Sequence, residues 1–132
     1  MRRRIIKKIL TFATTAIMAA CNSPQTTTAT DTILEPAEYI STLNADKNAL
    51  LLDVRHPEEY AEGHLPGATL LDVTDNDAFV EGIKKFDKEK TIYIYCRSGR
   101  RSRTAAKILT DEGFSVVDLK GGYNAWKQHT EQ

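Results

Sequence analysis

The sequence predicts an α/β protein with a central parallel β-sheet and helices on both of its faces. Short apolar runs alternate along the chain with segments of helical periodicity, and this alternation is typical of strand–helix–strand units in a parallel sheet. The apolar runs are continuous, as expected of strands that are buried on both faces. Residues 33–132 form the predicted domain, and roughly 100 residues can bury one core of modest size.

Four segments are predicted to be strands. The segment "ALLLDV" (Ala49–Val54) is an unbroken apolar run, and "TIYIY" (Thr91–Tyr95) consists of β-branched and aromatic residues, which favour strands. The segments "ATLLDV" (Ala68–Val73) and "FSVVDL" (Phe114–Leu119) are the other two. Because parallel sheets bind ligands beyond the carboxyl ends of their strands, the residues that follow these segments are candidates for a site.

Five segments carry the signals of helices. Residues 75–86 place their apolar side chains on one helical face. Residues 57–63 begin with proline and two glutamates and end with glycine. A serine is the predicted N-cap of a helix over 102–113, which a glycine ends. Helices are also expected over 35–45 and 121–129.

The N-terminal segment predicts export. Residues 1–8 carry five positive charges and no negative charge, residues 9–20 are mostly apolar and small, and Cys21 follows. This is the order of a secretory signal peptide, and the apolar part is shorter than the roughly 20 residues that a membrane-spanning helix needs. An amphipathic or anchoring N-terminal helix is the alternative.

The tetrapeptide "MAAC" (residues 18–21) resembles the lipobox of bacterial lipoproteins, in which the cysteine is lipidated and becomes the mature N-terminus. Met18 departs from that pattern, which usually has leucine or another branched residue there. The resemblance implies a periplasmic protein that acyl chains on Cys21 hold at a membrane, and ordinary cleavage is the alternative. The polar, Thr-rich residues 21–32 are then a flexible tether.

Charge and cysteine content narrow the function. Removal of residues 1–20 takes away five of the 18 basic side chains and none of the 18 acidic ones, so the remaining chain has a net charge of about −5. This argues against nucleic-acid binding, which needs a broad basic face. With Cys21 lipidated, Cys96 is the only free thiol. The three histidines and this thiol lack metal-ligand spacing, so no metal or cofactor is expected.

The arginines that follow Cys96 form a local cluster. The six residues from Cys96 to Arg101 lie between a strand and the predicted helix, and such a tight loop directs backbone N–H groups into a concavity. The helix N-terminus adds positive potential. These features favour a thiolate at Cys96 beside a site for an anion. A structural cysteine is the alternative, but arginines at a helix N-terminus oppose the macrodipole unless an anion binds there.

Three motifs together resemble a single-domain rhodanese of the thiosulfate sulfurtransferase family. They are "CRSGRRS" (96–102), "LLDVRHPEEYAEGHLPGA" (51–68) and "LKGGYNAW" (119–126), in the order that the family has them. The resemblance covers nearly all of residues 35–129. It implies a rhodanese-like fold and a cysteine that carries sulfur as a persulfide.

The resemblance also implies a reaction in two steps. Cys96 takes the outer sulfur of thiosulfate and sulfite leaves. A thiophilic acceptor, cyanide or a thiol, then removes that sulfur, and a protein thiol is a further candidate acceptor. Backbone N–H groups of the loop are expected to hold the persulfide sulfur, and arginines are expected to hold the sulfonate end of thiosulfate. The predicted substrate-binding residues are Arg97, Ser98, Gly99, Arg100 and Arg101, with Arg103 expected to face solvent.

Two other functions remain open on the same fold. A phosphatase of the dual-specificity type, or a related arsenate reductase, requires an arginine six residues after the cysteine. Ser102 occupies that position, and arginines stand one residue too early and one too late. The shorter loop is better matched to a single sulfur than to a phosphate. A non-enzymatic sulfur-carrier or interaction module is the other alternative, although such members usually lack the cysteine.

Two residues at the end of a predicted strand are candidate supporting residues. Asp53 could accept hydrogen bonds from the cysteine loop, pair with an arginine, or cap the following helix. Arg55 is expected to pair with Glu59. Gly121 and Gly122 follow the last predicted strand and are expected to let the backbone approach the cysteine loop.

Overall fold

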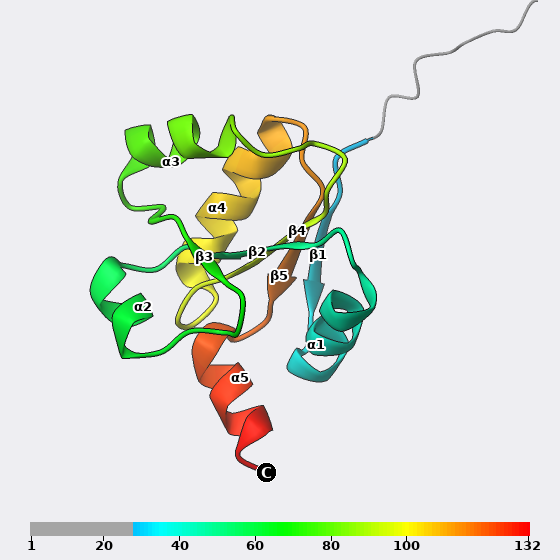
Figure 1. Cartoon of the computed structure of the whole chain (residues 1–132), viewed down its shortest axis with the longest axis vertical. Coiled ribbons are helices and arrows are strands. Elements are labelled where there is room, and N and C mark those ends of the chain that lie inside the picture. Colours follow the sequence, from blue (N-terminus) through cyan, green and yellow to red (C-terminus); the bar gives the residue numbers. More distant parts are fainter. Residues whose placement is uncertain (1–27) are drawn as a thin grey trace, which may run out of the picture.

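A computed structural model describes residues 28–132 (Figure 1). The predicted signal peptide and Cys21 lie outside the described residues. Strands and helices alternate in the order β1 (Asp31–Leu34), α1 (Pro36–Ala45), β2 (Leu50–Asp53), α2 (Pro57–Glu62), β3 (Thr69–Leu70), α3 (Asn76–Ile83), β4 (Ile92–Tyr95), α4 (Arg100–Asp111), β5 (Val116–Leu119) and α5 (Gly122–Thr130). Within this part of the chain, no helix is long and apolar enough to cross a membrane.

The five strands form one sheet in the order β1-β5-β4-β2-β3. All four pairings are parallel, so the predicted fold class is confirmed. β4 lies at the centre, and each of its four residues is buried. The register places Asp53, the last residue of β2, beside Tyr95, the last residue of β4. The carboxyl ends of these two strands therefore meet at one edge of the sheet.

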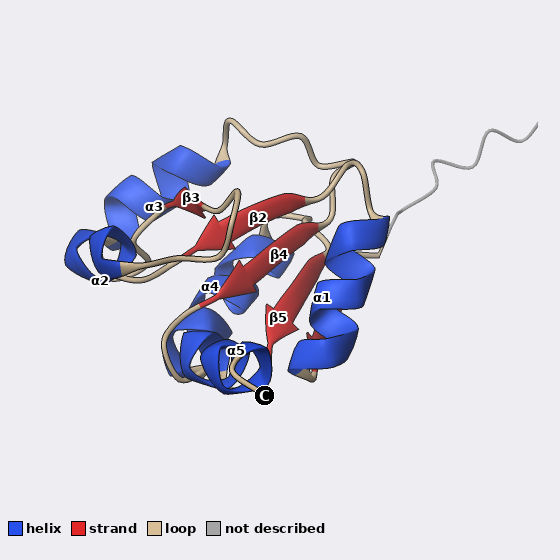
Figure 2. Ribbon diagram, turned by 60° about the horizontal axis from the view of Figure 1, so that its bottom comes forward, coloured by secondary structure: helices blue, strands red, loops and turns tan. Residues whose placement is uncertain are grey.

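Helices cover both faces of the sheet (Figure 2), and an apolar cluster lies on each face. On one face, Ile92 and Ile94 pack with residues of α3 and α4. On the other face, Tyr93 and Tyr95 pack with residues of α1 and α5. Successive side chains of a strand point to opposite faces, so the continuous apolar runs of the sequence supply both clusters.

The first strand extends into the segment that the sequence assigned to a tether. β1 begins at Asp31 and pairs with β5 through Asp31↔Val116 and Leu34↔Leu119. Three of its four residues are exposed, because it lies at an edge of the sheet. An edge strand needs few apolar side chains. The polar residues before Ile33 therefore gave no apolar pattern from which the strand could be predicted.

Helix α4 begins earlier than the sequence predicted. Its first residue is Arg100, and the N-cap is Gly99, whose φ of 97° is in the left-handed region. The prediction that Ser102 caps the helix is wrong, because this serine lies buried within the first turn and donates its hydroxyl to Asp118. Glycine adopts the left-handed conformation without a steric penalty, so the loop turns into the helix two residues sooner.

Candidate active site

Cys96 lies directly after β4 and before the N-terminus of α4, at the carboxyl edge of the sheet. Its side chain is fully buried. The backbone N–H of Gly99 donates to Cys96 Sγ at 3.0 Å. A backbone donor and a helix N-terminus both stabilise negative charge, so this position suits a sulfur anion.

The N-terminus of α5 holds the cysteine loop from the other side. The backbone N–H of Tyr123 donates to the Cys96 carbonyl at 2.8 Å, and that of Asn124 donates to the Arg97 carbonyl at 3.1 Å. Gly122 has a φ of 61°, and a Cβ placed on it would lie 2.5 Å from the Cys96 carbonyl oxygen. The prediction that glycines here allow a close backbone approach is confirmed.

Behind the sulfur lies a polar chain that the sequence did not indicate. The Cys96 thiol donates to Ser102 Oγ at 3.6 Å, and Ser102 Oγ donates to Asp118 Oδ2 at 3.1 Å. Arg103 Nε donates to the same carboxylate at 2.8 Å, and its guanidinium also pairs with Asp31 at 3.0 Å. The prediction that Arg103 faces solvent is therefore wrong, because two carboxylates hold its side chain.

The predicted substrate-binding arginines differ in their surroundings. Arg101 makes a two-pronged ion pair with Glu59, with N–O distances of 2.6 and 2.8 Å. Hydrogen bonding from Arg101 lowers the pKa of Glu59 to about 2, although partial burial opposes this. Arg97 is 64% exposed and lies 3.8 Å from Glu59, and Arg100 is exposed. Arg97 and Arg100 are therefore the more accessible cations of the loop.

Asp53 and Arg55 form a buried ion pair at the end of β2. Arg55 Nη2 lies 2.7 Å from Asp53 Oδ2, and the Tyr95 hydroxyl donates to the same oxygen at 2.7 Å. Arg55 also donates to the Gly63 carbonyl at 2.6 Å, and its guanidinium carbon lies 4.3 Å from the centroid of the Tyr123 ring and 5.5 Å from that of the Tyr95 ring. Of the three roles considered for Asp53, the structure shows pairing with an arginine.

The prediction that Arg55 pairs with Glu59 is wrong. Asp53 is two residues from Arg55, and its carboxylate also accepts the Arg55 backbone N–H at 3.0 Å, whereas Glu59 is held by Arg101. The N-cap of α2 is His56, and the Glu59 side chain accepts the His56 backbone N–H at 3.0 Å. Glu59 thus joins the start of α2 to the start of α4.

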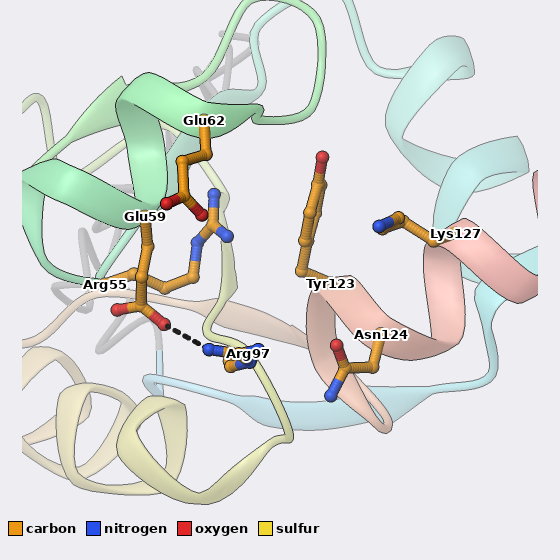
Figure 3. Close-up of a pocket in the computed structure, with 7 residues that line it drawn as sticks. All are labelled: Arg55, Glu59, Glu62, Arg97, Tyr123, Asn124 and Lys127. Atoms are coloured by element: carbon orange, nitrogen blue, oxygen red, sulfur yellow. Dashed lines mark ion pairs between the residues drawn. The ribbon is translucent and has the colours of Figure 1, made fainter.

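A pocket with a volume of about 190 Å³ opens beside the cysteine loop (Figure 3). Arg97, the residue after Cys96, is in its wall, whereas Cys96 itself is buried and does not line the pocket. Side chains of both charges line the pocket, with α2 opposite α5. The lining residues are Arg55, Glu59, Glu62, Arg97, Tyr123, Asn124 and Lys127.

Several residues around the site were missed by reasoning from the sequence. Glu59, Glu62 and Lys127 lie on short helices where charged residues usually face solvent, so no local signal separates them from other surface charges. Asp118 did have a signal, because it interrupts the apolar segment "FSVVDL" one residue before the end of its strand. A charged residue inside a buried strand requires a partner.

The parallel α/β fold and the cysteine loop at the N-terminus of α4 are the features by which this chain can be compared with known proteins. Residues 35–129 match the family described as "Rhodanese-like domain". The chain belongs to this family. The match spans the elements from α1 to α5 and therefore includes the whole cysteine loop.

Individual relatives agree with that assignment. A protein of Allochromatium vinosum described as "Sulfurtransferase" is 36% identical over 95 residues, which cover 70% of this chain and 86% of the relative. "Thiosulfate sulfurtransferase GlpE" of Pseudomonas entomophila is 35% identical over 82 residues, with 61% and 72% covered. A rhodanese-like domain protein from Staphylococcus aureus, known from a crystal structure, is 30% identical in sequence to this chain and superposes on it with a TM-score of 0.64. The match covers 72% of this chain and 90% of that protein. The family and its named relatives support a general sulfurtransferase activity.

Proposed function

We propose that the protein transfers sulfane sulfur from thiosulfate, or a similar donor, to cyanide or a thiol through a persulfide on Cys96. The observation that carries this proposal is the placement of the only cysteine in residues 28–132. Its sulfur accepts the Gly99 N–H at 3.0 Å at the start of α4. This is a fixed environment for an anionic sulfur, formed before the reaction begins.

The first step forms one bond and breaks another. The sulfur of Cys96 supplies an electron pair to the outer sulfur of thiosulfate, and the bond between the two thiosulfate sulfurs breaks. Sulfite leaves with that electron pair, and Cys96 keeps the transferred sulfur as a persulfide. In the second step the acceptor attacks the terminal sulfur, the persulfide bond breaks, and Cys96 regains its electron pair.

Arg97 is the proposed holder of the sulfonate end of thiosulfate. It follows Cys96 directly, is exposed, and lines the pocket beside the loop. Arg101 could bind thiosulfate only after its ion pair with Glu59 had broken. Arg100 is the third arginine of the loop and the second candidate. Because Cys96 is fully buried in this structure, the loop has to move before thiosulfate can reach the sulfur.

The test is an assay of thiocyanate formation from thiosulfate and cyanide. We expect activity in the full chain and none in Cys96→Ser. We also expect intact mass spectrometry to show a gain of one sulfur atom after thiosulfate treatment, and Cys96→Ser to show no gain. Hydrolysis of an aryl phosphate without any thiosulfate turnover would overturn the proposal.

The phosphatase alternative receives less support from the side chains. The position six residues after Cys96 is Ser102, which is buried and bonded to Asp118. The neighbouring arginines, Arg101 and Arg103, are paired with carboxylates. A phosphate would therefore have to break an existing ion pair to obtain an arginine at this end of the loop.

We further propose that the protein is exported to the periplasm and held at a membrane by lipid on Cys21. The support is the basic, apolar and small-residue order of residues 1–20 followed by the cysteine. In a membrane fractionation, we expect the full chain in the membrane fraction and Cys21→Ala in the soluble fraction. Membrane association that persists in Cys21→Ala contradicts this proposal.

A further inference from the structure

The polar chain behind Cys96 joins the sulfur to a buried carboxylate. Sγ lies 3.6 Å from Ser102 Oγ, and Ser102 Oγ lies 3.1 Å from Asp118 Oδ2. Cys96 and Ser102 are 0% exposed and Asp118 is 2% exposed. A proton that leaves the thiol in this direction can therefore pass along buried side chains without reaching the bulk solvent.

The carboxylate at the end of this chain is incompletely satisfied. Asp118 Oδ1 is buried and has no hydrogen-bond partner within residues 28–132. A buried polar atom without a partner is costly, and more so when the group is charged. Burial raises the pKa of Asp118, while hydrogen bonds from Arg103 and Ser102 oppose that rise. Asp118 is therefore suited to accept a proton.

Other charged and titratable groups also face Asp118. Arg103 of α4 pairs with it at 2.7 Å, and the charge of Asp31 on β1 raises the pKa of Asp118 further. Tyr39 of α1 also interacts with the charge of Asp118. Burial is the main cause that raises the pKa of Tyr39, and the negative charge of Asp118 is the second. Arg103 favours the carboxylate in the resting protein, and Asp31 weakens that preference.

We propose that Asp118, acting through Ser102, takes the proton of the Cys96 thiol when the cysteine attacks a sulfur donor. This inference rests on the proposed sulfurtransferase function. The thiol proton moves to Ser102 Oγ while the hydroxyl proton of Ser102 moves to Asp118 Oδ2. The electron pair left on sulfur forms the bond to the outer sulfur of thiosulfate, and sulfite leaves with the pair of the broken bond.

The transfer keeps the charge of the buried site constant. Before the step, the ionised Asp118 behind Ser102 disfavours a second negative charge on the sulfur, so the site holds a neutral thiol and a carboxylate. The Gly99 N–H then stabilises the sulfur anion that forms in the reaction. Afterwards the site holds a persulfide anion and a neutral carboxylic acid. A persulfide beside an ionised Asp118 would place two like charges in a buried region, which is unfavourable. When the acceptor removes the sulfur, the Cys96 thiolate recovers its proton along the same path.

The test compares the pH dependence of Cys96 reactivity in the full chain and in Asp118→Asn, which accepts hydrogen bonds but takes no proton. Two rates are measured, persulfide formation from thiosulfate in a single turnover and alkylation of Cys96 by iodoacetamide. We expect the unaltered protein to react at a rate that stays constant through neutral pH, above the titration of Asp118. In Asp118→Asn the rate should rise about tenfold per pH unit and be on the order of 100-fold lower at neutral pH.

Two further variants separate this role from a structural one. Ser102→Ala breaks the path at its middle while Asp118 stays in place, and the same rising profile is expected. It also serves as the test if Asp118→Asn does not fold. Asp31→Asn also removes one negative charge beside Arg103, but Asp31 makes no contact with the Ser102 path. The rate of this variant should stay independent of pH, as in the unaltered protein.

Each outcome decides one of the two proposals. Identical pH profiles in the unaltered protein, Asp118→Asn and Ser102→Ala refute the proton path and leave the sulfurtransferase proposal standing. The expected profiles with iodoacetamide, but no persulfide from thiosulfate, support the path and refute the sulfurtransferase. A uniform loss of rate without a change in slope shows that Asp118 only maintains structure. No reaction of Cys96 with either reagent overturns both proposals.

Discussion

At the scale of single residues, Glu59 is the carboxylate that lies beside two arginines of the cysteine loop. It pairs with Arg101 and lies 3.8 Å from Arg97, so one carboxylate competes with any anion for two loop arginines. Glu59→Gln removes that competition and should lower the KM for thiosulfate by about fivefold, or roughly 1 kcal/mol. The measurement is steady-state thiocyanate formation, and Glu62→Gln is the control because it lines the same pocket. An unchanged or higher KM in Glu59→Gln would contradict the competition.

The same ion pair makes a pH-dependent contribution to stability. Folding lowers the pKa of Glu59 from its ordinary 4.5 to about 2, through the hydrogen bond from Arg101. A lowered carboxyl pKa stabilises the folded state above the unfolded pKa, and this stabilisation disappears as the pH falls through the folded pKa. Glu59→Gln should therefore unfold with a free energy lower by about 1–2 kcal/mol at neutral pH. The difference should vanish as the pH approaches 2, which urea titrations at several pH values can measure.

At the scale of elements, the contact between α5 and the cysteine loop depends on Gly122. In Gly122→Ala the new Cβ would meet the Cys96 and Arg97 carbonyls at 2.5–2.7 Å, and the left-handed backbone adds roughly 1 kcal/mol of strain. We expect a loss of about 3 kcal/mol or more in the free energy of unfolding, together with reduced thiocyanate formation. Gly67→Ala is the matched control, because Gly67 also has a positive φ but no atom lies within 4 Å of its Cβ position. Equal effects of the two substitutions would show that backbone strain alone is responsible.

The sequence predicted the elements better than the contacts between their side chains. Strand and helix periodicity located β2, β4, α3 and α5, because burial on a fixed face leaves a local pattern. It missed β1, whose exposed edge position requires no such pattern. Ion-pair choices were also missed, because Arg55 has several carboxylates close to it along the chain and the partner of Arg101 is 42 residues away. Only the folded arrangement of α2 and α4 decides that Glu59 goes to Arg101.

At the scale of the whole molecule, β1 completes the sheet although it precedes residues 35–129, which match the family. Its backbone bonds to β5 include Val116 N–H to the Thr30 carbonyl and Lys120 N–H to the Leu34 carbonyl, and Asp31 holds Arg103. A chain that starts at Glu35 should lose roughly 2 kcal/mol in the free energy of unfolding relative to a chain that starts at Thr28. Urea denaturation of the two chains is the measurement. Equal midpoints and slopes would show that β1 adds nothing to stability.

The parallel sheet also fixes an orientation. All five strands run the same way, so β1 starts at the amino edge of the sheet (Figure 1). The pocket is lined by residues that follow β2, β4 and β5 and therefore lies at the opposite, carboxyl edge. The N-terminal end of the described residues therefore enters the domain on the side away from the pocket, and a group joined to that end would not cover the pocket.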